Sequence, residues 1–139
     1  LEMNENLIFK ETGERNGKVQ NIKKDNTTII NKVLELKNKG LNIAVWGVIA
    51  SFNESVKNYT GPSFGTNLER NEVTKIFNDL LKNRLKHLDI PFVSIFEEML
   101  NADGTTKPEY LDDWEGCHIH LNQKAMPIIL EAFRKQKMI

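Results

Sequence analysis

Apolar residues recur at helical spacing in three stretches of the chain. Asp25–Thr27 supply helix-capping side chains, and the apolar positions that follow predict a helix over residues 26–39. A longer amphipathic helix is predicted over residues 68–88, where leucine, isoleucine and phenylalanine return every three or four positions. The third helix is expected over residues 126–137, and Pro127 is better tolerated near its start than inside it.

Two other apolar stretches have the pattern of buried strands. Residues 41–50 form a continuous, β-branched run, which is typical of a strand covered on both faces and places Trp46 in the core. Residues 91–96 read as a second buried strand. Near the start, residues 7–9 predict a brief strand, and the glycines and polar residues of 10–17 predict a loop after it.

The order of strands and helices predicts an α/β fold. Right-handed crossovers between successive strands give a three-layer α/β/α sandwich with a parallel sheet, and we expect one domain over residues 1–139. Three strands are few for such a sheet, so an N-terminal strand is expected to be missing or supplied by a partner chain. Asp103-Gly104 predicts a turn, and Pro108 opens a short helical turn.

Composition narrows the classes of function. The 139 residues carry 19 basic and 19 acidic side chains without long blocks of one sign, which argues against nucleic acid and membrane surfaces as partners. The longest apolar run is too short to span a bilayer, and we expect a cytoplasmic protein. The one cysteine, Cys117, cannot form an internal disulfide. The chain starts with Leu1-Glu2-Met3, which suggests a processed or trimmed chain.

Loops at the carboxyl ends of parallel strands are where ligands bind in open α/β sheets. Here those loops hold Glu11–Arg15, Ser51–Glu54 and Glu97–Asn101. Ser51 follows a strand directly, so it is a candidate substitute nucleophile or hydrogen-bond donor to a substrate; a plain strand-terminating serine is the alternative. Asn53 shares that loop and those alternatives.

The segment Cys117–Asn122 concentrates groups that support acid–base chemistry. His118 and His120 lie two positions apart, so in an extended segment they point to opposite sides. His120 is the better candidate base, because the following residues can anchor the last helix and fix its position. A histidine base needs a carboxylate to hold its tautomer. Three carboxylates lie nearby in sequence: Asp112, Asp113 and Glu115. The alternative is a surface or capping histidine.

The segment Tyr110–Asn122 resembles the last block of the SGNH/GDSL hydrolase superfamily, which pairs an aspartate with a histidine just before the final helix. The resemblance covers about two thirds of the chain. Its upstream motifs are Val45–Ser51, Arg70-Asn71, Phe77-Asn78, Ile90–Phe92 and Asp103-Gly104. It implies an SGNH/flavodoxin-like fold and an esterase or acyltransferase acting on an acylated carbohydrate or small ester, without a cofactor or metal. In such enzymes a serine attacks the ester carbonyl and a histidine takes its proton.

The resemblance implies His120 as general base and Asp113 or Asp112 as its orienting acid. Glu11 and Arg15 match a Gly-Glu-Ile-Asp-Cys-Arg pattern of the most similar subgroup, which implies a role in substrate binding. The Gly-Asp-Ser block that carries the superfamily's nucleophile does not occur in this sequence. None of the four serines lies in a Gly-Asp-Ser block. The nucleophile is therefore expected upstream of Leu1, or the chain does not use a classical catalytic triad. The serines are Ser51, Ser55, Ser63 and Ser94.

Other interpretations of the same residues stay open. Cys117 with His118 or His120 would form a thiol nucleophile and base, and Cys117, His120 and a carboxylate would form a zinc site. Trp114 is a candidate sugar-stacking platform or a loop anchor, and His87 is a packing or surface residue of the long helix. A catalytically inactive binding or assembly domain of a glycan-processing protein is the main alternative to an enzyme.

Overall fold

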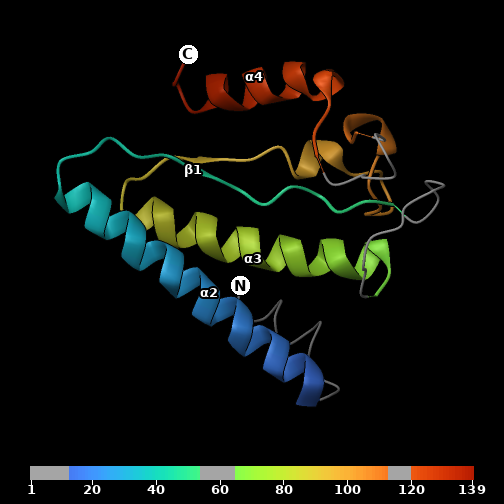
Figure 1. Ribbon diagram of the computed structural model, residues 1–139, viewed down its shortest axis with the longest axis horizontal. Helices are drawn as coiled ribbons and strands as arrows, with labels where there is room; N and C mark the ends of the chain where they lie inside the picture. The colour runs from blue at the N-terminus through green and yellow to red at the C-terminus, as the bar shows by residue number, and fades with distance from the viewer. Residues whose placement is uncertain (1–12, 54–64, 113–119) are drawn as a thin grey trace. The chain divides into compact units, whose positions relative to one another are not determined.

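A computed structural model describes residues 13–53, 65–112 and 120–139, and it shows a mixed α/β chain (Figure 1). The described residues form three helices and a small two-stranded parallel sheet. In chain order these are α2 (Gly13–Asn38), β1 (Val45–Trp46), α3 (Asn67–His87), β2 (Phe92–Val93) and α4 (Met126–Lys135). Short 3₁₀ turns lie at Glu97–Met99, Pro108–Tyr110 and Gln123–Ala125.

The chain divides into two compact units, and the prediction of a single domain stays a prediction. Unit 1 comprises Leu1–Val45 and Lys75–Phe92, and unit 2 comprises Trp46–Thr74 and Val93–Ile139. Each unit contains one rung of the ladder between β1 and β2. In unit 1 the amide of Val45 donates to the carbonyl of Pro91 at 2.9 Å; in unit 2 Gly47 donates to Val93 at 2.8 Å.

Unit 1 is built on apolar contacts between α2 and the second half of α3, which run beside one another in Figure 1. Leu85 and Leu81 have 0% and 1% of their surface exposed. Burial of this kind contributes about 1.5–3 kcal/mol for each large side chain. The buried residues of this cluster are Ile30, Val33, Leu81, Leu85 and Ile90.

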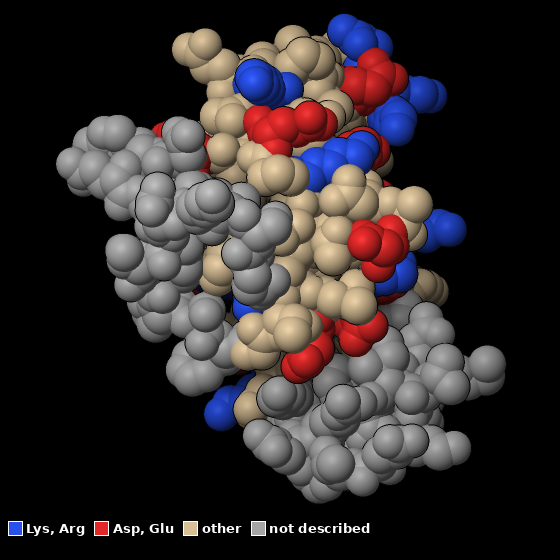
Figure 2. Space-filling view, turned by 90° about the vertical axis from the view of Figure 1, so that its right-hand side faces the viewer, with Lys and Arg blue, Asp and Glu red and all other residues tan. Residues whose placement is uncertain are grey.

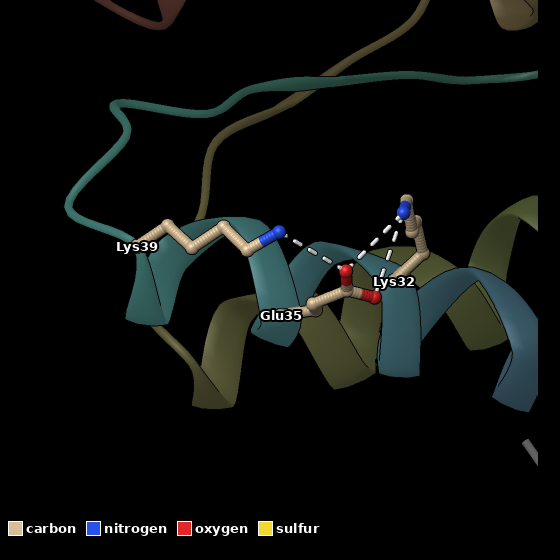
Figure 3. Close-up of polar contacts among 3 residues, drawn as sticks. All are labelled: Lys32, Glu35 and Lys39. Atoms are coloured by element: carbon tan, nitrogen blue, oxygen red, sulfur yellow. Dashed lines mark hydrogen bonds and ion pairs between the residues drawn. The ribbon is translucent and has the colours of Figure 1, made fainter.

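The outer face of α2 carries an exposed charge cluster (Figure 3). Lys32 and Lys39 each place their Nζ atom 3.4 Å from the same Glu35 Oε1. Exposed pairs at this helical spacing contribute about 0.3–0.5 kcal/mol each, since water screens them. The helix therefore depends on its buried face rather than on these ion pairs.

Unit 2 has its own core, formed by short elements rather than by long helices. Met99 and Ala125 are fully buried, and Trp46 stacks on Phe133 of α4 with ring centroids 6.1 Å apart. The buried residues of this cluster are Ala50, Phe52, Val93, Ile95, Phe96, Met99, Leu111, Ala125 and Ala132.

The helix predicted over residues 26–39 was too short at its start. The loop predicted over residues 10–17 was wrong for residues 13–17, which are helical. The helix α2 begins at Gly13, so it includes Gly17 and Arg15. A glycine inside a helix costs about 1 kcal/mol relative to alanine, which was the basis of the loop prediction. Residues 20–38 of the same helix pack an apolar face, and that gain outweighs one unfavourable residue.

The strand predicted over residues 41–50 was also too long, and it is not covered on both faces. Only Val45–Trp46 is regular strand, and Trp46 keeps 40% of its surface exposed. A sheet of two described strands offers hydrogen-bond partners for few residues, and Phe133 covers Trp46 only in part. The strand predicted over residues 91–96 is confirmed in part, as Phe92–Val93. Residues 7–9 lie outside the described residues.

Other local predictions are confirmed. The long helix begins at Asn67, and α4 begins at Met126 with Pro127 in its first turn. The Asp103-Gly104 turn and the Pro108 turn both form. None of the described helices combines the length and apolar character that crossing a bilayer requires. Acidic and basic side chains lie next to one another on the face that Figure 2 displays.

Asn26 is a polar side chain inside the apolar contact of unit 1. It is completely buried, and its Nδ2 donates to the Phe77 carbonyl oxygen at 3.2 Å. Its Oδ1 atom accepts no hydrogen bond from the described residues. An unsatisfied buried acceptor costs about 1–3 kcal/mol, more than one ordinary hydrogen bond returns.

We therefore expect Asn26→Leu to raise the free energy of unfolding by about 1 kcal/mol. Leucine has the same branching, and the Phe77 carbonyl keeps its acceptor role within α3. Urea titration followed by circular dichroism measures the change. Asn31→Leu, on the exposed face of α2, is the matched control and should change stability by less than about 0.5 kcal/mol. A clear loss of stability in Asn26→Leu would contradict the argument.

Candidate functional site

Ser51 lies five residues after the end of β1, not directly after a strand as predicted, and three side chains of α3 converge on it. The Ser51 amide donates to Asn71 Oδ1 at 3.1 Å. The Ser51 hydroxyl oxygen accepts from Asn67 Nδ2 at 2.9 Å and from Arg70 Nε at 3.2 Å. Both lone pairs of the hydroxyl oxygen are thereby engaged. Ser51 is half-buried and held in place by the helix that follows it in sequence.

Asn67 and Asn71 lie on one face of α3 because they are four residues apart. Only 1% and 2% of their surfaces are exposed. Asn67 Oδ1 accepts from the Thr106 amide at 2.8 Å, and Asn71 Nδ2 donates to the Gly104 carbonyl at 2.9 Å. The two asparagines therefore join the segment after β1 to the turn that precedes Thr106.

Thr106 is the point where these contacts meet, and it has no exposed surface. Its hydroxyl oxygen accepts from Asn67 Nδ2 at 3.0 Å and from Asn71 Nδ2 at 2.9 Å. Its carbonyl accepts from Asn53 Nδ2 at 3.1 Å. We call this set the Ser51 network. Its members are Ser51, Asn53, Asn67, Arg70, Asn71 and Thr106.

Arg70 completes the network at its outer side. The centre of its guanidinium lies 4.3 Å from the centroid of the Phe52 ring, a cation–π arrangement. The same group donates to the Phe52 carbonyl at 3.0 Å and to the Gly65 carbonyl at 2.6 Å. One side chain therefore bonds residues on both sides of residues 54–64.

The turn beside the network has a fixed backbone. Gly104 has φ of 89°, in the left-handed region, and a Cβ added there would lie 2.9 Å from Leu68 Cδ1. The Thr105 hydroxyl donates to Asp103 Oδ1 at 2.6 Å, and the Thr105 amide donates to the same oxygen at 3.0 Å. These two hydrogen bonds, the hydroxyl first, hold the pKa of the Asp103 carboxyl below its usual value.

The candidate base His120 also lies in unit 2, just before the turn that leads into α4. Leu111 and Leu121 form an antiparallel bridge, and the Asp112 amide donates to the His120 carbonyl at 2.7 Å. The imidazole is exposed. Asn122 Oδ1 accepts from the Lys124 amide at 2.8 Å, so the residue after the bridge does anchor the turn that leads into α4.

The structure brings together some of the predicted site residues and not others. Ser51 and Asn53 share the Ser51 network, while Asp112 and His120 are paired through their backbones. Arg15 belongs to α2 of unit 1 rather than to a loop. Three predicted residues lie outside the described residues: Glu11, Asp113 and Trp114. The alternatives built on Cys117 and His118 lie outside them too. His87 is exposed on α3, which is the surface alternative of the two predicted for it.

Four members of the network were not identified as site residues from the sequence. Arg70 and Asn71 served only as motifs of the resemblance, and Asn67 and Thr106 had no assigned role. The spacing of Asn67 and Asn71 on an otherwise amphipathic helix was the available signal, since two buried amides on one face require partners.

A metal centre finds no support in the described part of the chain, where no three His, Cys, Asp or Glu residues are placed to hold an ion. Comparisons of the chain with protein-family models, curated proteins and solved structures find no match.

The lowered pKa of the Asp103 carboxyl predicts that its contribution to stability changes only at acidic pH. The stability that ionised Asp103 contributes is present above its unfolded pKa and is lost as pH falls through the lowered folded pKa. Thr105→Val removes the larger cause, so the Asp103 pKa should rise toward its usual value. Titration of the carboxyl carbon shift by NMR measures this. Thr28→Val, whose hydroxyl bonds the Lys24 carbonyl in unit 1, should leave the Asp103 pKa unchanged.

Proposed function

We propose that this chain is an ester hydrolase or acyltransferase of SGNH type, with a three-layer α/β/α fold and a substrate that is an acylated carbohydrate or small ester. The observation that supports this most is the Ser51 network. It holds the segment that follows β1 with buried, hydrogen-bonded polar groups, and open α/β sheets bind ligands in the segments beyond the carboxyl ends of their strands. The His120 segment belongs to the same unit.

In the proposed reaction, His120 acts as general base on an attacking hydroxyl group. The hydroxyl oxygen bonds to the ester carbonyl carbon while its proton passes to the imidazole. The tetrahedral intermediate then collapses, the leaving alkoxide takes that proton, and the acyl group stays on the attacking oxygen. Asp113 or Asp112 orients the imidazole. Water as the final acceptor gives hydrolysis, and a sugar hydroxyl gives acyl transfer.

Ser51 is proposed to donate its hydroxyl proton to the substrate, in place of its 3.4 Å contact with Asn71 Oδ1, rather than to attack it. A nucleophilic oxygen needs a free lone pair, whereas those of Ser51 are engaged by Asn67 and Arg70. Asn53 lies on the same segment, and its amide is directed at the Thr106 carbonyl. Glu11, Arg15 and Trp114 remain proposed substrate contacts on the basis of the resemblance.

The enzyme proposal predicts that the purified chain hydrolyses p-nitrophenyl acetate and that His120→Ala lowers kcat/KM by about 100-fold or more. Release of p-nitrophenol measures both rates. His87→Ala is the matched control, because His87 is an exposed histidine on α3 of unit 1. Equal rates for wild type and His120→Ala would exclude His120 as the base, and no release by the wild type would exclude an esterase.

A fluorophosphonate should form a covalent adduct with a serine other than Ser51. The engaged hydroxyl predicts that Ser51→Ala is labelled as fully as the wild type. Mass spectrometry of the digested protein locates the adduct. An adduct on Ser51 would contradict the assignment of this residue to substrate contact, and an unlabelled wild type would contradict a covalent serine mechanism.

One observation favours a second candidate, a catalytically inactive binding or assembly domain of a glycan-processing protein. The hydrogen bonds of the Ser51 network are made within the protein, as in a structural core. In that case the network holds a surface for a carbohydrate or a partner chain. The wild-type rate with p-nitrophenyl acetate separates the two candidates, since only the enzyme releases p-nitrophenol.

A further inference from the structure

Arg70 combines contacts that no other side chain of the Ser51 network combines. It donates to a side-chain oxygen, Ser51 Oγ, and to two backbone carbonyls, those of Phe52 and Gly65. Its guanidinium also lies over the Phe52 ring. The remaining members bond mainly to one another and to the turn around Thr106.

The geometry of these contacts requires an arginine. A guanidinium is planar and carries five N–H donors in a fixed fork, so it can bond three acceptors in different directions while one face stacks on an aromatic ring. A lysine ammonium keeps the charge but cannot stack as a plane or reach the three oxygens together. Arg70 is half-buried, which strengthens these bonds relative to fully hydrated ones.

We propose that Arg70 is a positioning residue that fixes Ser51, Phe52 and Asn53, in the extended segment after β1, for substrate contact. This inference rests on the proposed function. Arg70 does not touch the reacting atoms in this proposal; it acts through Ser51 and through the backbone of Phe52. Small displacements of substrate contacts lower turnover strongly, about 100-fold for a shift of 1 Å.

The test measures p-nitrophenyl acetate hydrolysis by the full chain and its Arg70→Ala variant. We expect kcat to fall about 100-fold, with a smaller change in KM. Millimolar methylguanidinium should restore part of kcat by refilling the place above the Phe52 ring, whereas methylammonium should not. A purely structural role would not give rescue that depends on the shape of the cation. An unchanged kcat, or a loss that methylguanidinium does not reverse, would overturn the proposal.

A second measurement does not depend on activity. Arg70→Lys should fold, and its Ser51 amide should exchange with deuterium faster than that of the wild type, because the segment loses two of its anchors. Arg84→Lys is the control, since Arg84 lies on the same helix but bonds Thr27 in unit 1. Unchanged exchange in Arg70→Lys would overturn the positioning role. Absence of hydrolysis by the wild type would overturn the proposed function instead.

Discussion

The buried hydroxyl of Thr106, bonded by two asparagine amides, is the contact on which unit 2 depends most. A polar group without exposed surface must find its partners inside the protein, and the penalty for failing is about 1–3 kcal/mol for each group. Asn67 and Asn71 satisfy Thr106 only if the start of α3 lies against the turn at Gly104. The apolar cluster of unit 2 allows many arrangements, whereas this hydrogen-bonded arrangement allows very few.

Unit 1 is specified in a different way. Its long helix α2 and the second half of α3 pack Ile30, Val33 and Leu85 in a contact that requires only the right volume and periodicity. Asn26 is the exception, because its amide fixes the register against the Phe77 carbonyl while one of its oxygens stays unsatisfied. Asn67 and Asn71 of unit 2 are thus bonded through both polar side-chain atoms, whereas Asn26 of unit 1 is bonded through its donor alone.

This difference explains what the sequence could predict. Helix α3, the start of α4 and the turns at Asp103 and Pro108 depend on local periodicity and capping, and all were predicted. Arg15 was predicted to lie in a loop because the low helix propensity of its glycine neighbours is a local signal. The packing that stabilises α2 involves residues distant in sequence, which a local pattern does not report. The Ser51 network joins pairs of residues that lie 16 to 53 positions apart in the sequence. No local pattern therefore predicts which amide bonds which hydroxyl. The anchoring role of Asn122 was predicted because a capping residue acts on its immediate neighbours.

The Ser51 network also separates two requirements that an active serine would combine. A serine that holds a segment in place needs all its polar atoms in hydrogen bonds, because these bonds restrict its motion. A serine that attacks an ester needs a lone pair and a proton acceptor that are not already engaged in other hydrogen bonds. The hydrogen bonds from Asn67 and Arg70 give Ser51 the first of these roles. If the chain is an enzyme, the attacking hydroxyl must therefore come from another residue or from the acceptor substrate. In the proposed reaction the exposed His120, whose carbonyl accepts from the Asp112 amide, would act on a hydroxyl that arrives from outside the network.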